Sequence, residues 1–101
     1  MKCLRLAPAA RRDLDEIWLY VAHESGSEDA ATRVVEHIVE KFAMFVRFPF
    51  IGRDIGAEMH PDVRTFPADR YVIFYRPTES EIRVLRVIHA ARDAVADFLG
   101  E

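Results

Sequence analysis

The chain has a single cysteine, Cys3, and only four glycines among its 101 residues. One cysteine excludes an internal disulfide and a metal site built from several thiolates, and free cysteine is usually buried, so we expect Cys3 inside a first strand. Long apolar runs are also missing, because no stretch approaches the roughly 20 residues of a membrane span and charge appears early in the chain. We therefore expect a cytoplasmic protein with no membrane contact.

The chain also has no excess of basic residues, since the formal net charge is −3 and the isoelectric point about 5.8. Binding of phosphates needs a basic surface, so the chain by itself is not expected to bind DNA specifically. The average conceals one arginine-rich segment, residues 64–92, which has six arginines against three acids. This segment suits an acidic partner, or equally a set of solvated strand positions.

The motifs of common catalytic and metal sites are missing. There is no glycine-rich phosphate loop, no HExxH pattern and no paired cysteines, and the four histidines lack metal-ligand spacing. We therefore expect no cofactor, no metal and no catalytic residue. His89 stands apart from the other histidines, because it ends the last predicted strand close to Arg92 and suits a binding or packing role.

Half of the residues are hydrophobic, which is enough for one core, and we expect a single domain over residues 1–101. Apolar residues recur at helical spacing from Pro8 to about His23, with Pro8 suited to a first helical turn. Ser27, followed by two acids, predicts the start of a second helix that Pro49 ends. So short a connection predicts an antiparallel helical hairpin.

After a predicted loop over residues 50–62, apolar residues no longer recur at helical spacing but at every second position. Residues 63–66, 71–76 and 82–88 then read as three strands of an antiparallel meander, with residues 2–6 as a strand beside a later one. Residues 90–99 predict a short final helix. The fold class expected is α+β, with an N-terminal strand and a helical hairpin packed on an antiparallel β-sheet.

Several short motifs occur together, in a fixed order, over nearly the whole chain. They are Leu4-x-Leu6, Ala10-x-x-Asp13-Leu14-x-x-Ile17-x-x-Tyr20, Pro49-x-x-Gly52-Arg53, Val63-Arg64-x-Phe66-Pro67, Tyr71-x-Ile73-Phe74-Tyr75-Arg76 and Leu85-Arg86-Val87-Ile88-His89-Ala90-Ala91-Arg92-Asp93. With them the chain resembles the RelE/ParE superfamily, and its ParE branch most closely. The resemblance implies a twisted sheet and the toxin half of a type II toxin–antitoxin pair, neutralised by a ParD-like antitoxin.

The superfamily offers two activities, cleavage of messenger RNA on the ribosome by RelE-like members and inhibition of DNA gyrase by ParE-like members. When the motifs are aligned, positions that carry catalytic residues in the nucleases fall at Val72, Ala90 and Ala96. Apolar side chains can neither activate a 2′-hydroxyl nor stabilise a phosphorane. We therefore expect a non-enzymatic gyrase inhibitor; the alternatives are an mRNA interferase, or a degenerate, non-toxic member that serves antitoxin binding and operator autoregulation.

The candidate binding residues fall into two groups. Residues that could contact the target are Arg64, Arg76, Arg83, Arg86, His89 and Arg92. Apolar residues that could form the floor of an antitoxin site are Leu14, Trp18, Phe42 and Phe45. Arg83 and Arg86 are three positions apart and cannot share one face of a regular strand, so we expect one of them to be structural, paired with Asp93 or another acid.

Overall fold

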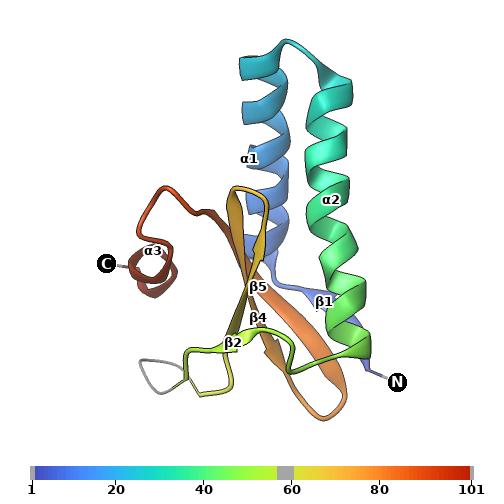
Figure 1. Ribbon diagram of the computed structural model, residues 1–101, viewed down its shortest axis with the longest axis vertical. Helices are drawn as coiled ribbons and strands as arrows, with labels where there is room; N and C mark the ends of the chain where they lie inside the picture. The colour runs from blue at the N-terminus through green and yellow to red at the C-terminus, as the bar shows by residue number, and fades with distance from the viewer. Residues whose placement is uncertain (1, 57–60, 101) are drawn as a thin grey trace.

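The computed structural model describes residues 2–56 and 61–100, and its elements follow the expected order (Figure 1). They are β1 (Cys3–Leu6), α1 (Pro8–Ser25), α2 (Glu28–Arg47), β2 (Arg53–Asp54), β3 (Arg64–Ala68), β4 (Tyr71–Pro77), β5 (Glu81–His89) and α3 (Ala94–Leu99). The predicted α+β class, with a hairpin of helices before a sheet, is confirmed.

The helical hairpin is set by local sequence at each end. Pro8 opens α1, which ends at Ser25, two residues beyond the predicted end at His23, and Gly26 caps it in the left-handed conformation at φ 67°. The Ser27 hydroxyl accepts a hydrogen bond from the Ala30 amide at 3.1 Å, as expected for the cap of α2. The two helices lie antiparallel and side by side (Figure 1).

The sheet has five strands in the order β1-β5-β4-β3-β2. Strands β3, β4 and β5 form the predicted antiparallel meander, whereas β1 pairs with β5 in parallel, so the sheet is mixed. Side chains alternate in the same way in parallel and antiparallel strands, which is why the sequence could not show the direction of β1. The segment expected to be only loop contributes β2, two residues that pair with β3.

Two further expectations were wrong in detail. Cys3 is exposed rather than buried, because β1 is an edge strand with a single neighbour. The last helix begins at Ala94 and not at Ala90, since Asp93 is its N-cap and accepts a hydrogen bond from the Ala96 amide at 3.1 Å. Within residues 2–56 and 61–100, no helix combines the length and apolar character needed to cross a membrane.

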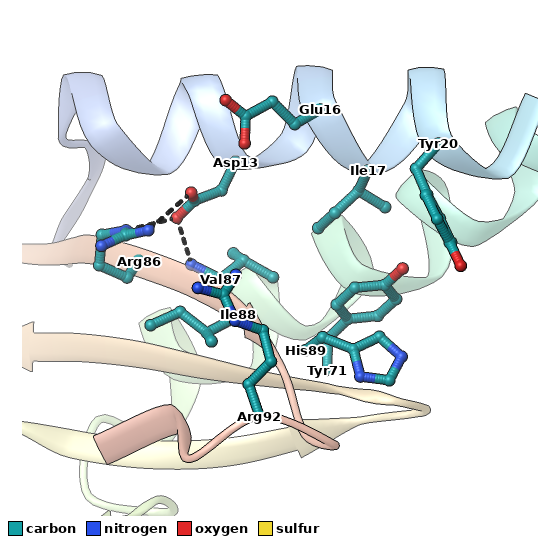
Figure 2. Close-up of a pocket in the computed structure, with 10 residues that line it drawn as sticks. All are labelled: Asp13, Glu16, Ile17, Tyr20, Tyr71, Arg86, Val87, Ile88, His89 and Arg92. Carbon is teal, nitrogen blue, oxygen red and sulfur yellow. Dashed lines mark hydrogen bonds and ion pairs between the residues drawn. The ribbon is translucent and has the colours of Figure 1, made fainter. Parts of the chain in front are cut away.

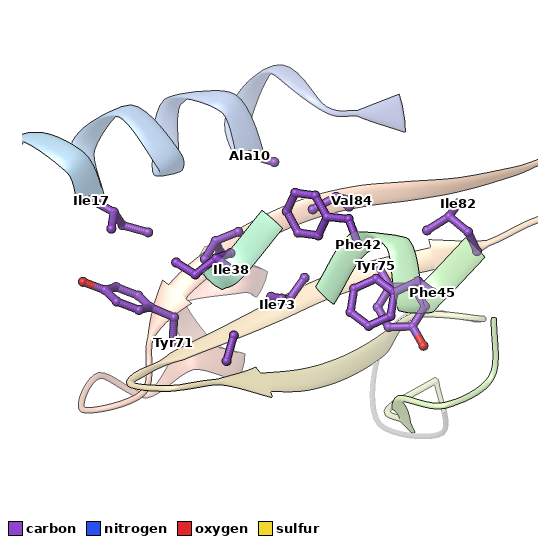
Figure 3. Close-up of a cluster of buried hydrophobic side chains, with 12 residues drawn as sticks. Ala10, Ile17, Ile38, Phe42, Phe45, Tyr71, Ile73, Tyr75, Ile82 and Val84 are labelled. Atoms are coloured by element: carbon purple, nitrogen blue, oxygen red, sulfur yellow. The ribbon is translucent and has the colours of Figure 1, made fainter. Parts of the chain in front are cut away.

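Hydrophobic residues are buried on both faces of the sheet. The helical hairpin covers one face, where Ile38 and Phe42 of α2 pack with Ile73 and Val84 of the sheet (Figure 3). On the other face α3 packs over part of a second cluster, and its Phe98 ring stacks on Phe74 with ring centres 4.4 Å apart. Strand β4 is therefore buried on both sides, in agreement with its nearly continuous apolar sequence.

Candidate functional site

A buried carboxylate joins α1 to β5. Asp13 lies on the inner side of α1 with only 8% of its surface exposed. Its Oδ2 accepts hydrogen bonds from Arg86 Nε at 2.7 Å and the Val87 amide at 2.9 Å, and its Oδ1 accepts one from Arg86 Nη2 at 3.0 Å (Figure 2). The hydrogen bonds that Arg86 donates to Asp13 raise the pKa of the Arg86 guanidinium against the opposing effect of burial.

A β-bulge allows Arg86 to reach this carboxylate. Phe74 is opposite Arg86 and Tyr75 is opposite Val84, so Leu85 is the extra residue in β5. Leu85 packs with the cluster beneath α3, while Arg86 turns to α1. Arg86 is therefore the structural member of the Arg83/Arg86 pair, and its partner is Asp13 rather than Asp93.

Beyond this ion pair, a groove runs between α1 and the ends of β4 and β5. It consists of two adjoining pockets of about 450 and 690 Å³ that share Tyr20, Tyr71 and His89. The His89 ring meets Tyr71 edge-on with ring centres 5.1 Å apart (Figure 2). His89 Nδ1 accepts a hydrogen bond from the Ala91 amide at 3.0 Å. Burial, and secondarily Tyr20, raises the pKa of Tyr71, which keeps its hydroxyl neutral. The groove thus has an aromatic floor.

Charged residues line the rim of the groove. Arg92 pairs with Asp97 of α3 at 2.6 Å while two thirds of its side chain stays exposed, and Glu16, Glu24 and Arg70 add both signs of charge. Three of the six predicted target residues, Arg86, His89 and Arg92, therefore line one pocket. A floor of aromatic rings with a charged rim suits an amphipathic peptide.

The other predicted target residues lie elsewhere. Arg76 and Arg83 are opposite each other on β4 and β5, and Arg5 of β1 is opposite Arg83, so three arginines form a row across the sheet. Arg76 alternates with Tyr75, which faces the hairpin, so this row lies on the other face. Arg64 is separate and structural, because its Nη1 donates to the Gly52 carbonyl at 2.8 Å.

The burial of Phe42 and Phe45 contradicts their predicted place in an antitoxin site. They are 1% and 0% exposed, because the apolar stripe of α2 faces the sheet and Phe45 stacks on Tyr75 with ring centres 4.0 Å apart. Leu14 packs against the same core and is half-buried. Trp18 is also half-buried, and its indole N–H donates to the Thr32 hydroxyl across the hairpin at 3.1 Å.

Sequence reasoning missed Tyr20 and Tyr71 as site residues. Tyr20 is 59% exposed and follows Asp13 and Ile17 along the side of α1 that faces the sheet, and an aromatic ring close to the predicted apolar stripe was the available signal. Tyr71 offered none, because it resembles any other apolar strand residue. Across residues 2–56 and 61–100, no group of three or more histidine, cysteine, aspartate or glutamate side chains could hold a metal ion.

Comparison with known proteins identifies the family of the chain. Residues 4–94 match the family model described as the ParE toxin of type II toxin–antitoxin system, parDE. The chain belongs to the ParE toxin family. Membership implies an antitoxin as a partner of this ParE-type toxin.

Relatives in this family are similar over most of the chain. Toxin ParE1 of Mycobacterium tuberculosis (strain CDC 1551 / Oshkosh) is 35% identical, covering 87% of this chain and 89% of its own length. Toxin ParE1 of Caulobacter vibrioides is 31% identical, covering 95% and 97%. The solved structure of a chromosomal ParDE toxin–antitoxin system from P. aeruginosa matches with a TM-score of 0.76 and 26% identity, over 88% of this chain and 96% of that one.

Proposed function

We propose that this ParE-type toxin inhibits DNA gyrase by binding it, without catalysis, in the cytoplasm. One observation carries the non-enzymatic part of the proposal. The position where the nuclease alignment puts a catalytic arginine is apolar: Val72 packs against the cluster beneath α3 that contains Phe74. A metal-independent ribonuclease needs polar groups at its catalytic positions, so the apolar packing of Val72 supports inhibition by binding rather than by cleavage.

The target is tested with purified proteins. We expect the wild-type chain to inhibit supercoiling by gyrase in proportion to the toxin added, because a binding inhibitor acts stoichiometrically. A chain that instead cleaves messenger RNA in a translating extract and leaves supercoiling unchanged is an mRNA interferase. A chain that arrests no growth on expression supports the non-toxic, autoregulatory alternative.

We further propose that a ParD-like antitoxin neutralises the toxin by laying an amphipathic segment in the groove between α1 and β5. The aromatic floor formed by Tyr20, Tyr71 and His89 suits apolar side chains of such a segment, and the rim carries both positive and negative groups for its polar side. Tyr20 is 59% exposed, so much of its ring is available for burial.

Replacement of one exposed ring tests this groove. Tyr20→Ala removes a ring that contributes little to the toxin's own core, and we expect a loss of antitoxin affinity of about 10-fold to 30-fold with an unchanged fold. Leu19→Ala is the matched control, because Leu19 is 62% exposed on the same helix and lines neither pocket. Equal affinity of Tyr20→Ala and wild type, measured by calorimetry, would place the antitoxin elsewhere.

Trp18 needs a separate experiment, because it also joins the two helices. Its indole N–H bonds Thr32, so Trp18→Ala is expected to lower the unfolding temperature as well as any affinity. Affinity and thermal stability are therefore measured on the same sample. A folded Trp18→Ala variant with wild-type antitoxin affinity would remove Trp18 from the antitoxin site.

A further inference from the structure

Exposed hydrophobic side chains are concentrated at the opposite end of the hairpin from the groove. Seven large hydrophobic residues are exposed in the described part of the chain, and three of them lie in the tight turn after α2. They are Phe48, Phe50 and Ile51, exposed by 56%, 69% and 43%. We call these three residues, with the flanking Arg47 and Arg53, the aromatic turn. Apolar surface so concentrated in four consecutive positions is typical of an interaction site.

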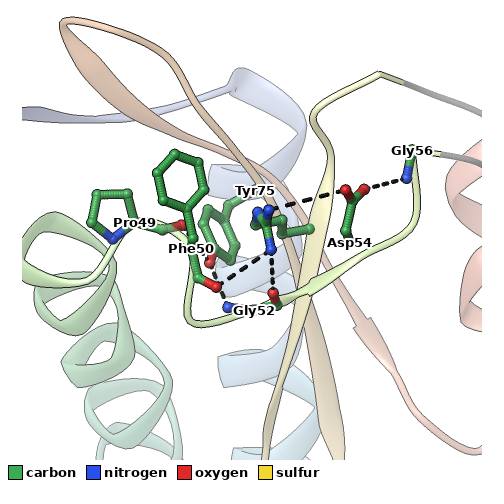
Figure 4. Close-up of polar contacts among 7 residues, drawn as sticks. Pro49, Phe50, Gly52, Asp54, Gly56 and Tyr75 are labelled. Carbon is green, nitrogen blue, oxygen red and sulfur yellow. Dashed lines mark hydrogen bonds and ion pairs between the residues drawn. The ribbon is translucent and has the colours of Figure 1, made fainter.

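The backbone of the aromatic turn is fixed although its side chains are exposed. The hydroxyl of the buried Tyr75 donates to the Pro49 carbonyl at 2.9 Å and accepts from the Gly52 amide at 2.9 Å (Figure 4). Arg64 Nη1 donates to the carbonyls of Phe50 and Gly52. The backbone of the turn is thus held from inside by the core, so a partner that binds the exposed Phe50 ring has little backbone to order.

The charge around the turn is positive on a chain that is negative overall. Residues 47–53 contain two arginines and no acid, against a net charge of −3 for the whole sequence. Both arginines are exposed, and within residues 2–56 and 61–100 neither has an ion pair with a carboxylate. The Arg47 guanidinium lies 5.5 Å from the centre of the Phe48 ring, and that of Arg64 4.9 Å from the centre of Phe50.

We infer that the aromatic turn is the surface through which the toxin engages its target, an acidic protein face with an apolar pocket that receives Phe50. This rests on the proposed function. An exposed ring on a fixed backbone needs a concave partner, which a folded protein offers and an extended antitoxin segment does not. The antitoxin segment has its own groove at the other end of the hairpin, so the two surfaces are separate. Aromatic anchors beside arginines are the composition of interface hot spots.

The test uses Phe50→Ser, with Leu19→Ser as the matched control because the two side chains are similarly exposed, at 69% and 62%. For each variant, thermal unfolding, antitoxin affinity, inhibition of gyrase supercoiling and growth arrest are measured. We expect Phe50→Ser to need about 30-fold more toxin for half inhibition and to lose growth arrest, with antitoxin affinity and fold unchanged. Leu19→Ser is expected to behave as wild type.

Arg53→Glu is an independent variant that tests charge complementarity. Arg53 is exposed and belongs to the two-residue strand β2, so the substitution spares the core. We expect weaker inhibition by Arg53→Glu, and for wild type an inhibition that weakens as salt rises, because exposed charges are screened.

The inference is overturned if Phe50→Ser and Arg53→Glu inhibit as well as wild type. It is also overturned if Phe50→Ser loses antitoxin affinity to the same degree, or only dissociates a dimer, because the turn then contacts the antitoxin or a second copy. A wild-type chain that arrests growth without inhibiting gyrase refutes only the proposed target, and the growth of Phe50→Ser still decides the inference. A wild-type chain with neither effect overturns both.

Discussion

The ion pair between α1 and β5 gives a quantitative prediction for stability. Asp13→Asn keeps the shape of the side chain but removes its charge and replaces one acceptor oxygen by an amide donor. The new amide cannot satisfy the two Arg86 donors and the Val87 amide that the carboxylate now accepts. Loss of a partner in a buried pair costs roughly 3–5 kcal/mol. The Arg86 side chain is 32% exposed and can regain water, so we expect about 2–3 kcal/mol.

For a domain of this size such a loss lowers Tm by roughly 10–20 °C. Urea unfolding followed by circular dichroism measures the free energy, and thermal unfolding checks the shift in Tm. Asp15→Asn is the control, because Asp15 is exposed on the same helix and its replacement should change stability by less than about 0.5 kcal/mol. If Asp13→Asn costs no more than Asp15→Asn, the link between α1 and β5 does not stabilise the fold.

Three further predictions concern the core. Gly52→Ala should lower the unfolding free energy by about 1–3 kcal/mol in urea titration, because its Cβ would lie 2.8 Å from both the Thr65 carbonyl and the Tyr75 hydroxyl; an unchanged midpoint contradicts that close packing. Burial raises the pKa of Tyr75 above its usual value near 10, because the folded protein favours the neutral hydroxyl over the phenolate. The stability that comes from burying the neutral hydroxyl is therefore complete below pH 10 and is lost as pH rises through the raised pKa. Tyr75→Phe should therefore weaken the loss of stability above about pH 10, and an identical pH profile of the two proteins would refute this. Phe98→Ala removes the stack on Phe74 and should cost about 1–2 kcal/mol and speed amide hydrogen exchange throughout α3, whereas wild-type exchange rates would show that α3 is held by other contacts.

Local features of the sequence determined the elements and their order. The change of hydrophobic period near residue 60 separated helices from strands, because each period reflects which side chains of one element share a face. The Ser27 cap and the end of α2 before Pro49 could also be predicted from the sequence, since a cap or a proline acts on neighbouring backbone groups. The alternation of side chains along a strand also showed that Arg83 and Arg86, three positions apart, could not have the same role.

Only the tertiary structure decided what each face contacts. The stripe that carries Phe42 and Phe45 has the same pattern whether a partner or the chain's own sheet covers it, and here the sheet does. The structural role of Arg86 depends on Asp13, which is 73 positions away, and on a bulge that the sequence pattern did not reveal. The direction of β1 and the groove at Tyr20 likewise arise from pairing and packing between distant segments. Short-range patterns follow from neighbouring residues, whereas contacts across the fold require the positions of all the elements at once.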